Sequence, residues 1–290
     1  MFTYLLKGYQ TMICKALLNP FLTILVLATI VLCPGMARAD LTITPVRVVF
    51  EGRDRSATVE LINTTNKTNT YRMRWMEMKM GPSGRYELIP ADDKDPNSVA
   101  NMVIFSPRQV TIEPHGQQTI RLSLRRPADL PDGEYRAHLG MVRLAKQGPE
   151  RPNPNAKGVE MDMRVNLGFS IPVIVRAGND KDLKISLINP KLEMSPDPQN
   201  PTPVLKIDLH RDSGKFSAYG QVTVYWTPSK GSEKIIGNMA NMALYPELET
   251  RPIMVPLKEN PDSGTLRIVY AGKYESDGKT WAEKILPIGK

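Results

Sequence analysis

The sequence predicts an all-β protein made of two sandwich domains, and three observations support this fold class. Apolar and polar residues alternate along most segments after the first 39 residues, which is the periodicity of half-buried strands. Gly, Pro, Asn and Asp interrupt these segments at short intervals, and the 25 prolines fit a fold rich in turns. At 290 residues, the chain is long enough for two domains of ordinary size.

Residues 1–39 predict a cleaved secretory signal peptide. Lys7 and Lys15 precede an apolar stretch from Phe21 to Cys33, and Ala37-Arg38-Ala39 provides an A-x-A cleavage site. The apolar stretch is shorter than the ~20 residues that a membrane-spanning helix needs, so an uncleaved N-terminal anchor is the less favoured alternative. We therefore expect an exported mature chain that starts at Asp40 and has no membrane span.

Cysteine content and charge further limit the function. Both cysteines lie in the predicted signal peptide, so the mature chain has no disulfide and no thiol nucleophile. The net charge of +8 includes three basic residues of the signal peptide, which leaves +5 for the mature chain. Because the basic residues are scattered through the predicted strands, we expect a solvated basic surface and no nucleic-acid partner.

The expected strands fall into two domains, 40–177 and 178–290. In the first, we expect Leu41–Phe50, Ser56–Asn63, Tyr71–Met78, Val103–Ile112, Gln118–Arg125, Glu134–Leu144 and Val159–Arg176, with a variable region at Gly81–Asn101. In the second, we expect Leu183–Ile188, Val204–Leu209, Gly220–Trp226, Ile253–Leu257, Thr265–Tyr270 and Trp281–Pro287. Trp75 on the third strand and a tyrosine-corner pattern ending at Tyr135 are typical of an immunoglobulin-like sandwich, although each alone fits other all-β cores.

The expected strand Val159–Arg176 follows a Pro- and Asn-rich connection at residues 146–158. Its odd-numbered residues as far as Val175 are all apolar, and this alternation lasts far longer than the 5–6 residues of an ordinary strand. The C-terminal half can bury its apolar row in its own sandwich. The N-terminal half carries a second row with no evident partner at home, consisting of Val159, Met161, Met163, Val165 and Leu167, which we call the donor row.

An unpaired apolar edge of this kind invites a partner strand. A protein that lacks one strand of its own sandwich could accept the donor row and complete its sheet, which is donor-strand complementation. Burial of the five side chains would contribute on the order of 10 kcal/mol before the costs of association. A long, ordinary core strand explains the same alternation equally well.

Arg47 is the second informative feature. It shares the parity of the apolar residues Leu41, Ile43 and Val49 on the first strand, unless Pro45 introduces a bulge. A partly buried guanidinium group needs an anion, and a carboxylate can accept two parallel hydrogen bonds from it. Taken alone, this residue fits an internal ion pair, or a side chain that reaches water, better than a ligand contact.

The first domain also contains a specific set of motifs. These are Thr42-Ile43-Thr44-Pro45-Val46-Arg47-Val48-Val49-Phe50-Glu51-Gly52, Arg55-Ser56-Ala57 followed by a Val-x-Leu-x-Asn strand, Ile112-Glu113-Pro114 with Gly116-Gln117-Gln118-Thr119, and Ile171–Arg176. Taken in order, they resemble the periplasmic PapD-like pilus chaperones. The resemblance is clear from Leu41 to Arg176 and faint afterwards.

This resemblance implies two immunoglobulin-like β-sandwich domains in a boomerang arrangement, in the periplasm of a Gram-negative bacterium. It implies that Arg47 anchors the C-terminal carboxylate of a pilus subunit, and that Arg176 has a structural role at the domain junction. It also implies that the subunit's groove is filled by Val159, Met161, Met163, Val165 and Leu167. The family's second anchor, a lysine, falls on Pro172, so either Arg136 or Arg108 replaces it or the anchoring differs.

The function that the resemblance implies is an ATP-independent chaperone, without a cofactor, that binds pilin-like fimbrial subunits and delivers them to an outer-membrane usher. A reversible dimer that covers the donor row is a further expectation. No enzymatic activity is expected, because His115, His138 and His210 lack metal-ligand spacing and no G-x-S-x-G motif occurs. The alternative function is a secreted structural fimbrial subunit or adhesin.

Overall fold

The regular structure of this protein is almost entirely β-strand. In the computed structural model, residues 40–90, 92–93, 95–144, 168–197, 199 and 201–289 are described. The predicted signal peptide and the donor row lie outside these residues. Within them, no helix is long and apolar enough to cross a membrane. The chain from Leu41 to Lys290 groups into one unit.

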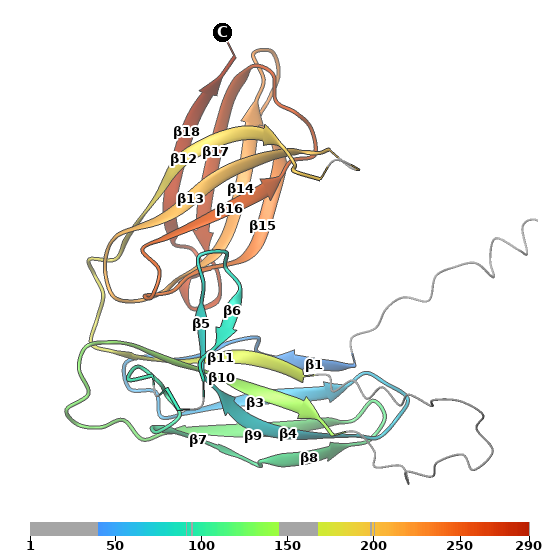
Figure 1. The fold of residues 1–290 in the computed structure, drawn as a ribbon, viewed down its shortest axis with the longest axis vertical. Helices are drawn as coiled ribbons and strands as arrows, with labels where there is room; N and C mark the ends of the chain where they lie inside the picture. The colour runs from blue at the N-terminus through green and yellow to red at the C-terminus, as the bar shows by residue number, and fades with distance from the viewer. Residues whose placement is uncertain are drawn as a thin grey trace, which may run out of the picture. The chain divides into compact units, whose positions relative to one another are not determined.

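Two sheets make up the first sandwich. Its strands are β1 (Leu41–Thr44), β2 (Val48–Phe50), β3 (Ser56–Asn63), β4 (Asn69–Met76), β7 (Val103–Ser106), β8 (Gln109–Ile112), β9 (Gln117–Leu124), β10 (Gly133–Arg143) and β11 (Gly168–Ala177). One sheet has the order β1-β3-β9-β7, and the other has the order β2-β11-β10-β4-β8 (Figure 1). Neighbouring strands are antiparallel except β2 and β11, which run parallel. This is an immunoglobulin-like arrangement, as the sequence predicts.

Two segments that the sequence predicts as single strands are each divided between the two sheets. The expected strand Leu41–Phe50 consists of β1, which pairs with β3, and β2, which pairs with β11. The expected strand Val103–Ile112 consists of β7, which pairs with β9, and β8, which pairs with β4. Pro45 and Pro107 stand at the two crossings, and a proline cannot donate a hydrogen bond to a sheet. The prediction of continuous strands at these two places was therefore wrong.

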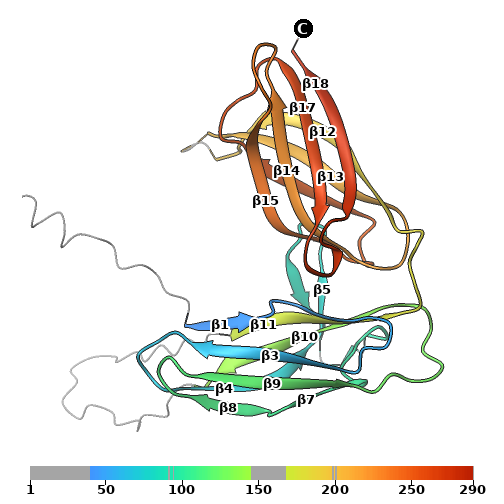
Figure 2. The same ribbon diagram turned by 180° about the vertical axis from the view of Figure 1, so that it is seen from behind.

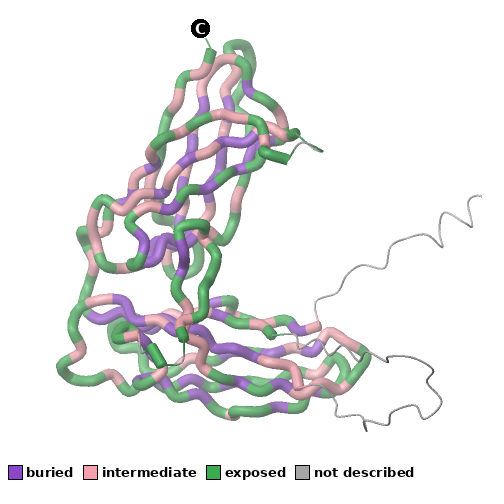
Figure 3. Tube along the Cα trace, viewed as in Figure 1, coloured by how far each residue is buried: buried purple, intermediate pink, exposed green. Residues whose placement is uncertain are grey.

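The core of the first sandwich lies between its two sheets, and Figure 3 shows the buried residues along its strands. Both predicted immunoglobulin-like features are present. Trp75 packs edge-on against Phe105, with 5.3 Å between the ring centroids. The hydroxyl of Tyr135 donates a hydrogen bond of 2.9 Å to the carbonyl oxygen of Pro131, which closes the tyrosine corner.

The second sandwich has its own core and two further sheets (Figure 2). Its strands are β12 (Lys184–Met194), β13 (Pro203–Ser213), β14 (Ala218–Thr227), β15 (Lys234–Leu244), β16 (Thr250–Pro256), β17 (Gly264–Gly272) and β18 (Thr280–Ile288). They form sheets of order β12-β13-β16 and β15-β14-β17-β18, again as in an immunoglobulin-like sandwich. The sequence prediction missed β15, because two register shifts against β14 interrupt its alternation.

A short hairpin begins just before the region Gly81–Asn101, which the sequence marks only as variable, and ends inside it. Strands β5 (Met78–Met80) and β6 (Tyr86–Leu88) pair antiparallel. Met80 is buried in the core of the second sandwich, and its amide donates a hydrogen bond of 2.9 Å to Glu247 Oε1. The hydroxyl of Tyr86 donates to that of Tyr245 at 3.1 Å. The hairpin therefore joins the first sandwich to the second.

The tyrosine corner makes a prediction about stability. The substitution Tyr135→Phe removes the donor to the Pro131 carbonyl and should lower the free energy of unfolding by about 1–2 kcal/mol. Urea denaturation of both proteins measures this change. Tyr225→Phe is the matched control, because its ring lies 4.1 Å from the Arg267 guanidinium and keeps that contact. We expect the control to change stability by less than about 0.5 kcal/mol, and equal losses in both variants would contradict a special role for the corner.

Candidate functional site

The outer face of the five-stranded sheet brings together Arg47 and part of β11. In β11, Val173 faces the core of the first sandwich and Ile174 packs into the core of the second. In β2, Val48 faces the first core and Val49 packs against the second. Because neighbouring residues of an extended chain point to opposite faces, Arg47 lies on the same outer face as Val49.

Four residues form a row across this outer face. Val173 pairs with Val48, which puts Pro172 beside Arg47. Pro172 pairs with His138 on its other side, and His138 pairs with Met76 of β4. Pro172, where the resemblance would place a lysine, thus lies between Arg47 and His138 and offers no charge of its own.

Arg47 is a buried cation whose hydrogen-bonding capacity is unused. The residue is only 4% exposed, and its guanidinium carbon lies 4.1 Å from the centroid of the Tyr219 ring. Its Nη2 lies 2.9 Å from Glu275 Oε1, which is close enough for an ion pair. None of its three side-chain nitrogens makes a hydrogen bond within the described chain. The contact with Glu275 is therefore short enough for a hydrogen bond, but its angles are unsuitable for one. The donors of this guanidinium are therefore buried and left without hydrogen bonds in the described chain, which is a costly state for a cation.

The edge of β11 is open next to Arg47. On one side, β10 pairs with β11 along its length, from Gly168 to Ala177. On the other side, β2 pairs only with Val173–Val175. In the described ranges, no strand pairs with Gly168–Pro172 on that second side. The unpaired edge of a strand can pair with a further strand. Arg47 lies at the end of the unpaired edge of β11.

Arg176 lies where the two sandwiches meet, and its guanidinium group is satisfied. Its Nε donates to Glu134 Oε2 at 3.0 Å, and its Nη1 donates to Glu51 Oε1 at 2.5 Å. Its Nη2 donates to the carbonyl oxygen of Ser217 at 3.0 Å, and the Ser217 amide donates to Glu134. Burial lowers the pKa of Arg176, but Glu134 and Glu51 outweigh burial and raise it above its usual value. These contacts fit a structural role, as the resemblance implies.

The two arginines that the sequence offers in place of the missing lysine lie in different surroundings. Arg136 is held by Glu247, with its Nη2 2.5 Å from Oε1, and its guanidinium carbon lies 3.6 Å from the Tyr245 ring centroid. Arg108 is exposed, and its carbonyl accepts the amide of Met73, so it lies beside β4 and β8 at the far edge of the sheet. Which residue, if either, replaces the lysine stays a prediction.

His138 is a further residue of the row on this outer face, and it is held neutral. It is 2% exposed, neither ring nitrogen has a hydrogen bond within the described chain, and the Tyr86 ring packs edge-on against it at 4.7 Å. Burial, followed by the nearby charge of Arg136, lowers the pKa of His138 to about 3. Its sequence neighbours gave no signal of this burial.

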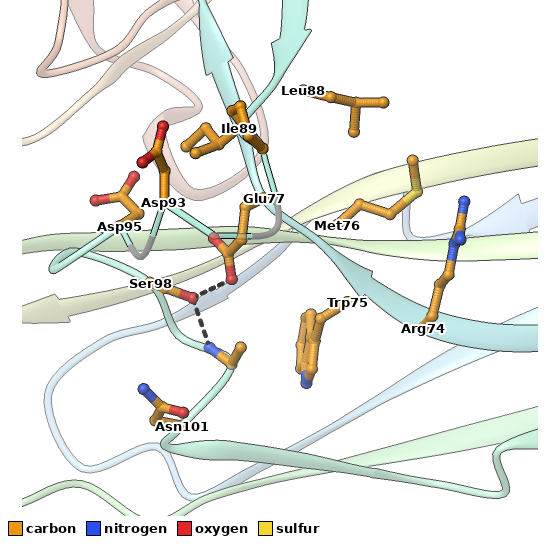
Figure 4. Close-up of a pocket in the computed structure, with 12 residues that line it drawn as sticks. Arg74, Trp75, Met76, Glu77, Leu88, Ile89, Asp93, Asp95, Ser98 and Asn101 are labelled. Carbon is orange, nitrogen blue, oxygen red and sulfur yellow. Dashed lines mark hydrogen bonds between the residues drawn. The ribbon is translucent and has the colours of Figure 1, made fainter.

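A separate cavity of about 590 Å³ lies at the end of β4 (Figure 4). In it, the Ser98 hydroxyl donates to Glu77 Oε1 at 2.5 Å, and the Ala100 amide donates to Ser98 Oγ. Burial raises the pKa of Glu77; the hydrogen bond from Ser98 opposes this shift and the Asp95 carboxylate adds to it. No three His, Cys, Asp or Glu side chains are grouped to hold a metal in the described part of the chain.

Sequence reasoning singled out Arg47 and Arg176, and it missed the residues that surround them. Glu275, Tyr219 and Ser217 come from the second sandwich, where the sequence shows no motif that links them to the first. The roles expected for Val159, Met161, Met163, Val165 and Leu167 concern side chains outside the described residues. Those roles remain predictions.

No protein-family model matches this chain, and no curated protein matches it. Solved structures that are similar to it are those of chaperones. The YadV chaperone is 13% identical, with 86% of this chain and 100% of that chain covered and a TM-score of 0.44. The CupB2 chaperone of Pseudomonas aeruginosa is 14% identical, with 86% and 100% covered and a TM-score of 0.44. The structure of the CsuC–CsuE chaperone–tip adhesion subunit complex of Acinetobacter baumannii is 16% identical. It covers 87% of this chain and 99% of that chain, with a TM-score of 0.40.

The buried His138 predicts how stability depends on pH. Its pKa is lower in the folded protein than the usual 6.5, so the unfolded chain binds a proton more readily. Its contribution to stability is complete above pH 6.5 and is lost as the pH falls from 6.5 towards 3, by up to about 1.4 kcal/mol per pH unit. Urea denaturation at pH 7, 6 and 5 measures this slope.

The substitution His138→Phe keeps a ring against Tyr86 and removes the titrating group. We expect the loss of stability between pH 7 and pH 5 to become smaller in this variant. His115→Gln is the control, because His115 is exposed and bonded to Asn66. A slope that is the same in wild type and His138→Phe would show that His138 is not the group responsible.

Proposed function

We propose that this protein is a periplasmic chaperone that binds pilin-like fimbrial subunits by donor-strand complementation and delivers them to an outer-membrane usher. The observation that carries the proposal is the open edge of β11 at Gly168–Pro172, which ends beside the buried Arg47. An open edge offers backbone hydrogen bonds to a partner strand, and the guanidinium offers charged donors to that strand's end. Together they favour binding of a peptide strand over catalysis.

The direction of β2 supports a C-terminal anchor. Beyond the open edge, the same side of β11 is occupied by β2, which runs parallel to β11. A partner strand that runs in this direction along Gly168–Pro172 would end at Arg47. Its C-terminal carboxylate would then meet the guanidinium, and a carboxylate can accept two parallel hydrogen bonds from an arginine. A partner that ran antiparallel would bring its N-terminal side to the same place.

The parity of β11 supports the role of the donor row. The core-facing residues of β11 are odd-numbered, among them Ile171, Val173 and Val175. Val159, Met161, Met163, Val165 and Leu167 continue this odd numbering upstream. Gly168 pairs with Val142, and β10 ends one residue later, at Arg143. In the proposed complex, the groove of a subunit would bury the side chains of the donor row.

The alternative of a structural fimbrial subunit or adhesin is less well supported. A subunit that needs a donated strand should have an incomplete sandwich, whereas both sheets of the first sandwich are well populated with strands. Arg47 and the open edge also lie where the first sandwich meets the second, so that both sandwiches contribute to the site. That arrangement fits a protein which binds a partner at its domain junction.

Capture of subunits from the native host tests this function. Tagged wild type, Arg47→Ala and Leu167→Glu are purified from the periplasm under pilus-expressing conditions, and bound proteins are identified by mass spectrometry. We expect small secreted β proteins with wild type and at least about tenfold less with either variant. Loss of the carboxylate contact accounts for the first effect, and burial of an unpaired charge in the subunit groove accounts for the second.

The matched control is Ile104→Glu, which adds the same charge at an exposed apolar position on β7, in the other sheet. We expect this variant to retain its bound subunits. Circular dichroism establishes that all variants are folded. Wild type that carries no stoichiometric partner, or variants that bind as wild type does, would speak against the chaperone function.

A further inference from the structure

The contact between Arg47 and Glu275 suggests how the anchor is controlled. Glu275 lies in the turn η1 (Tyr274–Ser276), which connects β17 and β18 of the second sandwich. Its Oε1 is 2.9 Å from Arg47 Nη2, and no other described carboxylate lies within ion-pair distance of Arg47. Glu275 therefore occupies the position at which a ligand carboxylate would meet this guanidinium.

The same carboxylate has a second cation within reach. Glu275 Oε1 lies 3.8 Å from Arg176 Nη2, so that a small movement of one side chain exchanges one arginine for the other. Arg176 does not depend on this contact, because Glu134, Glu51 and Ser217 already accept its hydrogen bonds. Glu275 can therefore leave Arg47 without becoming an unpaired buried charge, and that lowers the cost of its displacement.

The surroundings hold Arg47 in place when Glu275 moves. The Tyr219 ring lies against the guanidinium at 4.1 Å, which is a favourable cation–π contact. The carbonyl oxygen of Tyr219 accepts hydrogen bonds from the Lys273 amide at 3.3 Å and from Trp281 Nε1 at 3.0 Å. The turn that carries Glu275 is thus fixed to the same residue that supports Arg47. The Glu275 side chain is 14% exposed, so solvent reaches it.

We infer that Glu275 is an internal competitor for the anchor: it neutralises Arg47 in the free protein and moves to Arg176 when a partner's C-terminal carboxylate binds. This inference rests on the proposed function. When no partner is bound, Glu275 serves as the counter-ion of the buried guanidinium. Without it, the charge of Arg47 would be buried and uncompensated, which is costly. The affinity for a partner then depends on how much more strongly Arg47 binds the partner's C-terminal carboxylate than the carboxylate of Glu275. A partner with a neutral C-terminus cannot displace Glu275 and gains no affinity from Arg47.

Two peptides and four proteins test the inference. The probes are an N-acetylated peptide of alternating valine and threonine with a free C-terminal carboxylate, and the same peptide with a C-terminal amide. Calorimetry measures both affinities for wild type, Glu275→Gln, Arg47→Ala and the control Glu283→Gln, which lies on β18 with its side chain 46% exposed. We expect Glu275→Gln to bind the carboxylate peptide about tenfold more tightly than wild type does. Its affinity for the amide peptide should not change, and Glu283→Gln should behave as wild type.

The outcomes separate the inference from the proposed function. If wild type prefers the carboxylate peptide and Arg47→Ala loses this preference, but Glu275→Gln gains no affinity, then the anchor stands and competition by Glu275 is wrong. If wild type binds both peptides equally, or binds neither, the proposed anchor itself is overturned. Should Glu275→Gln not fold, Glu275→Asp decides, because its shorter side chain keeps the charge but withdraws it from Arg47. A gain of about threefold for the carboxylate peptide would support competition, and no gain would refute it.

Discussion

Neutralisation of buried guanidinium groups is the constraint on which the junction of the two sandwiches depends. A charge removed from water is costly unless an opposite charge and hydrogen bonds replace the solvent. Arg176 meets this requirement fully, with Glu134 and Glu51 from the first sandwich and Ser217 from the second. Arg47 meets it only in part, through one carboxylate that is near but poorly aligned. The two arginines therefore differ in how far the protein itself satisfies their hydrogen-bonding groups.

The position of Arg47 follows from the crossing of the chain between sheets. Between β1 and β2, the backbone leaves one sheet and joins the other beside β11. Because β2 is short, it covers only part of the β11 edge and leaves Gly168–Pro172 open. The same crossing turns Arg47 towards the second sandwich, where Tyr219 and Glu275 contact it. A divided first strand thus creates both the open edge and the cation at its end.

Much of the fold was predictable because strand periodicity and turn residues are local signals. Trp75 and Tyr135 were assigned correctly from their places in the strand order, and both make the contacts typical of an immunoglobulin-like sandwich. The divided strands, the β5–β6 hairpin and β15 were missed, since each depends on which partner a segment meets. Alternation identifies a strand, but it does not identify the neighbouring strand.

The sequence by itself determined the all-β class and one residue of interest, Arg47, together with the donor row as a prediction, whereas the family resemblance added Arg176. A charge in an apolar row and a long alternation are visible without coordinates, because they are properties of neighbouring residues. Only the tertiary structure decided that Arg47 faces Glu275 and Tyr219, and that Arg176 is already satisfied. The physical reason is that the partner of a buried charge is chosen by packing between segments more than 200 residues apart in the chain.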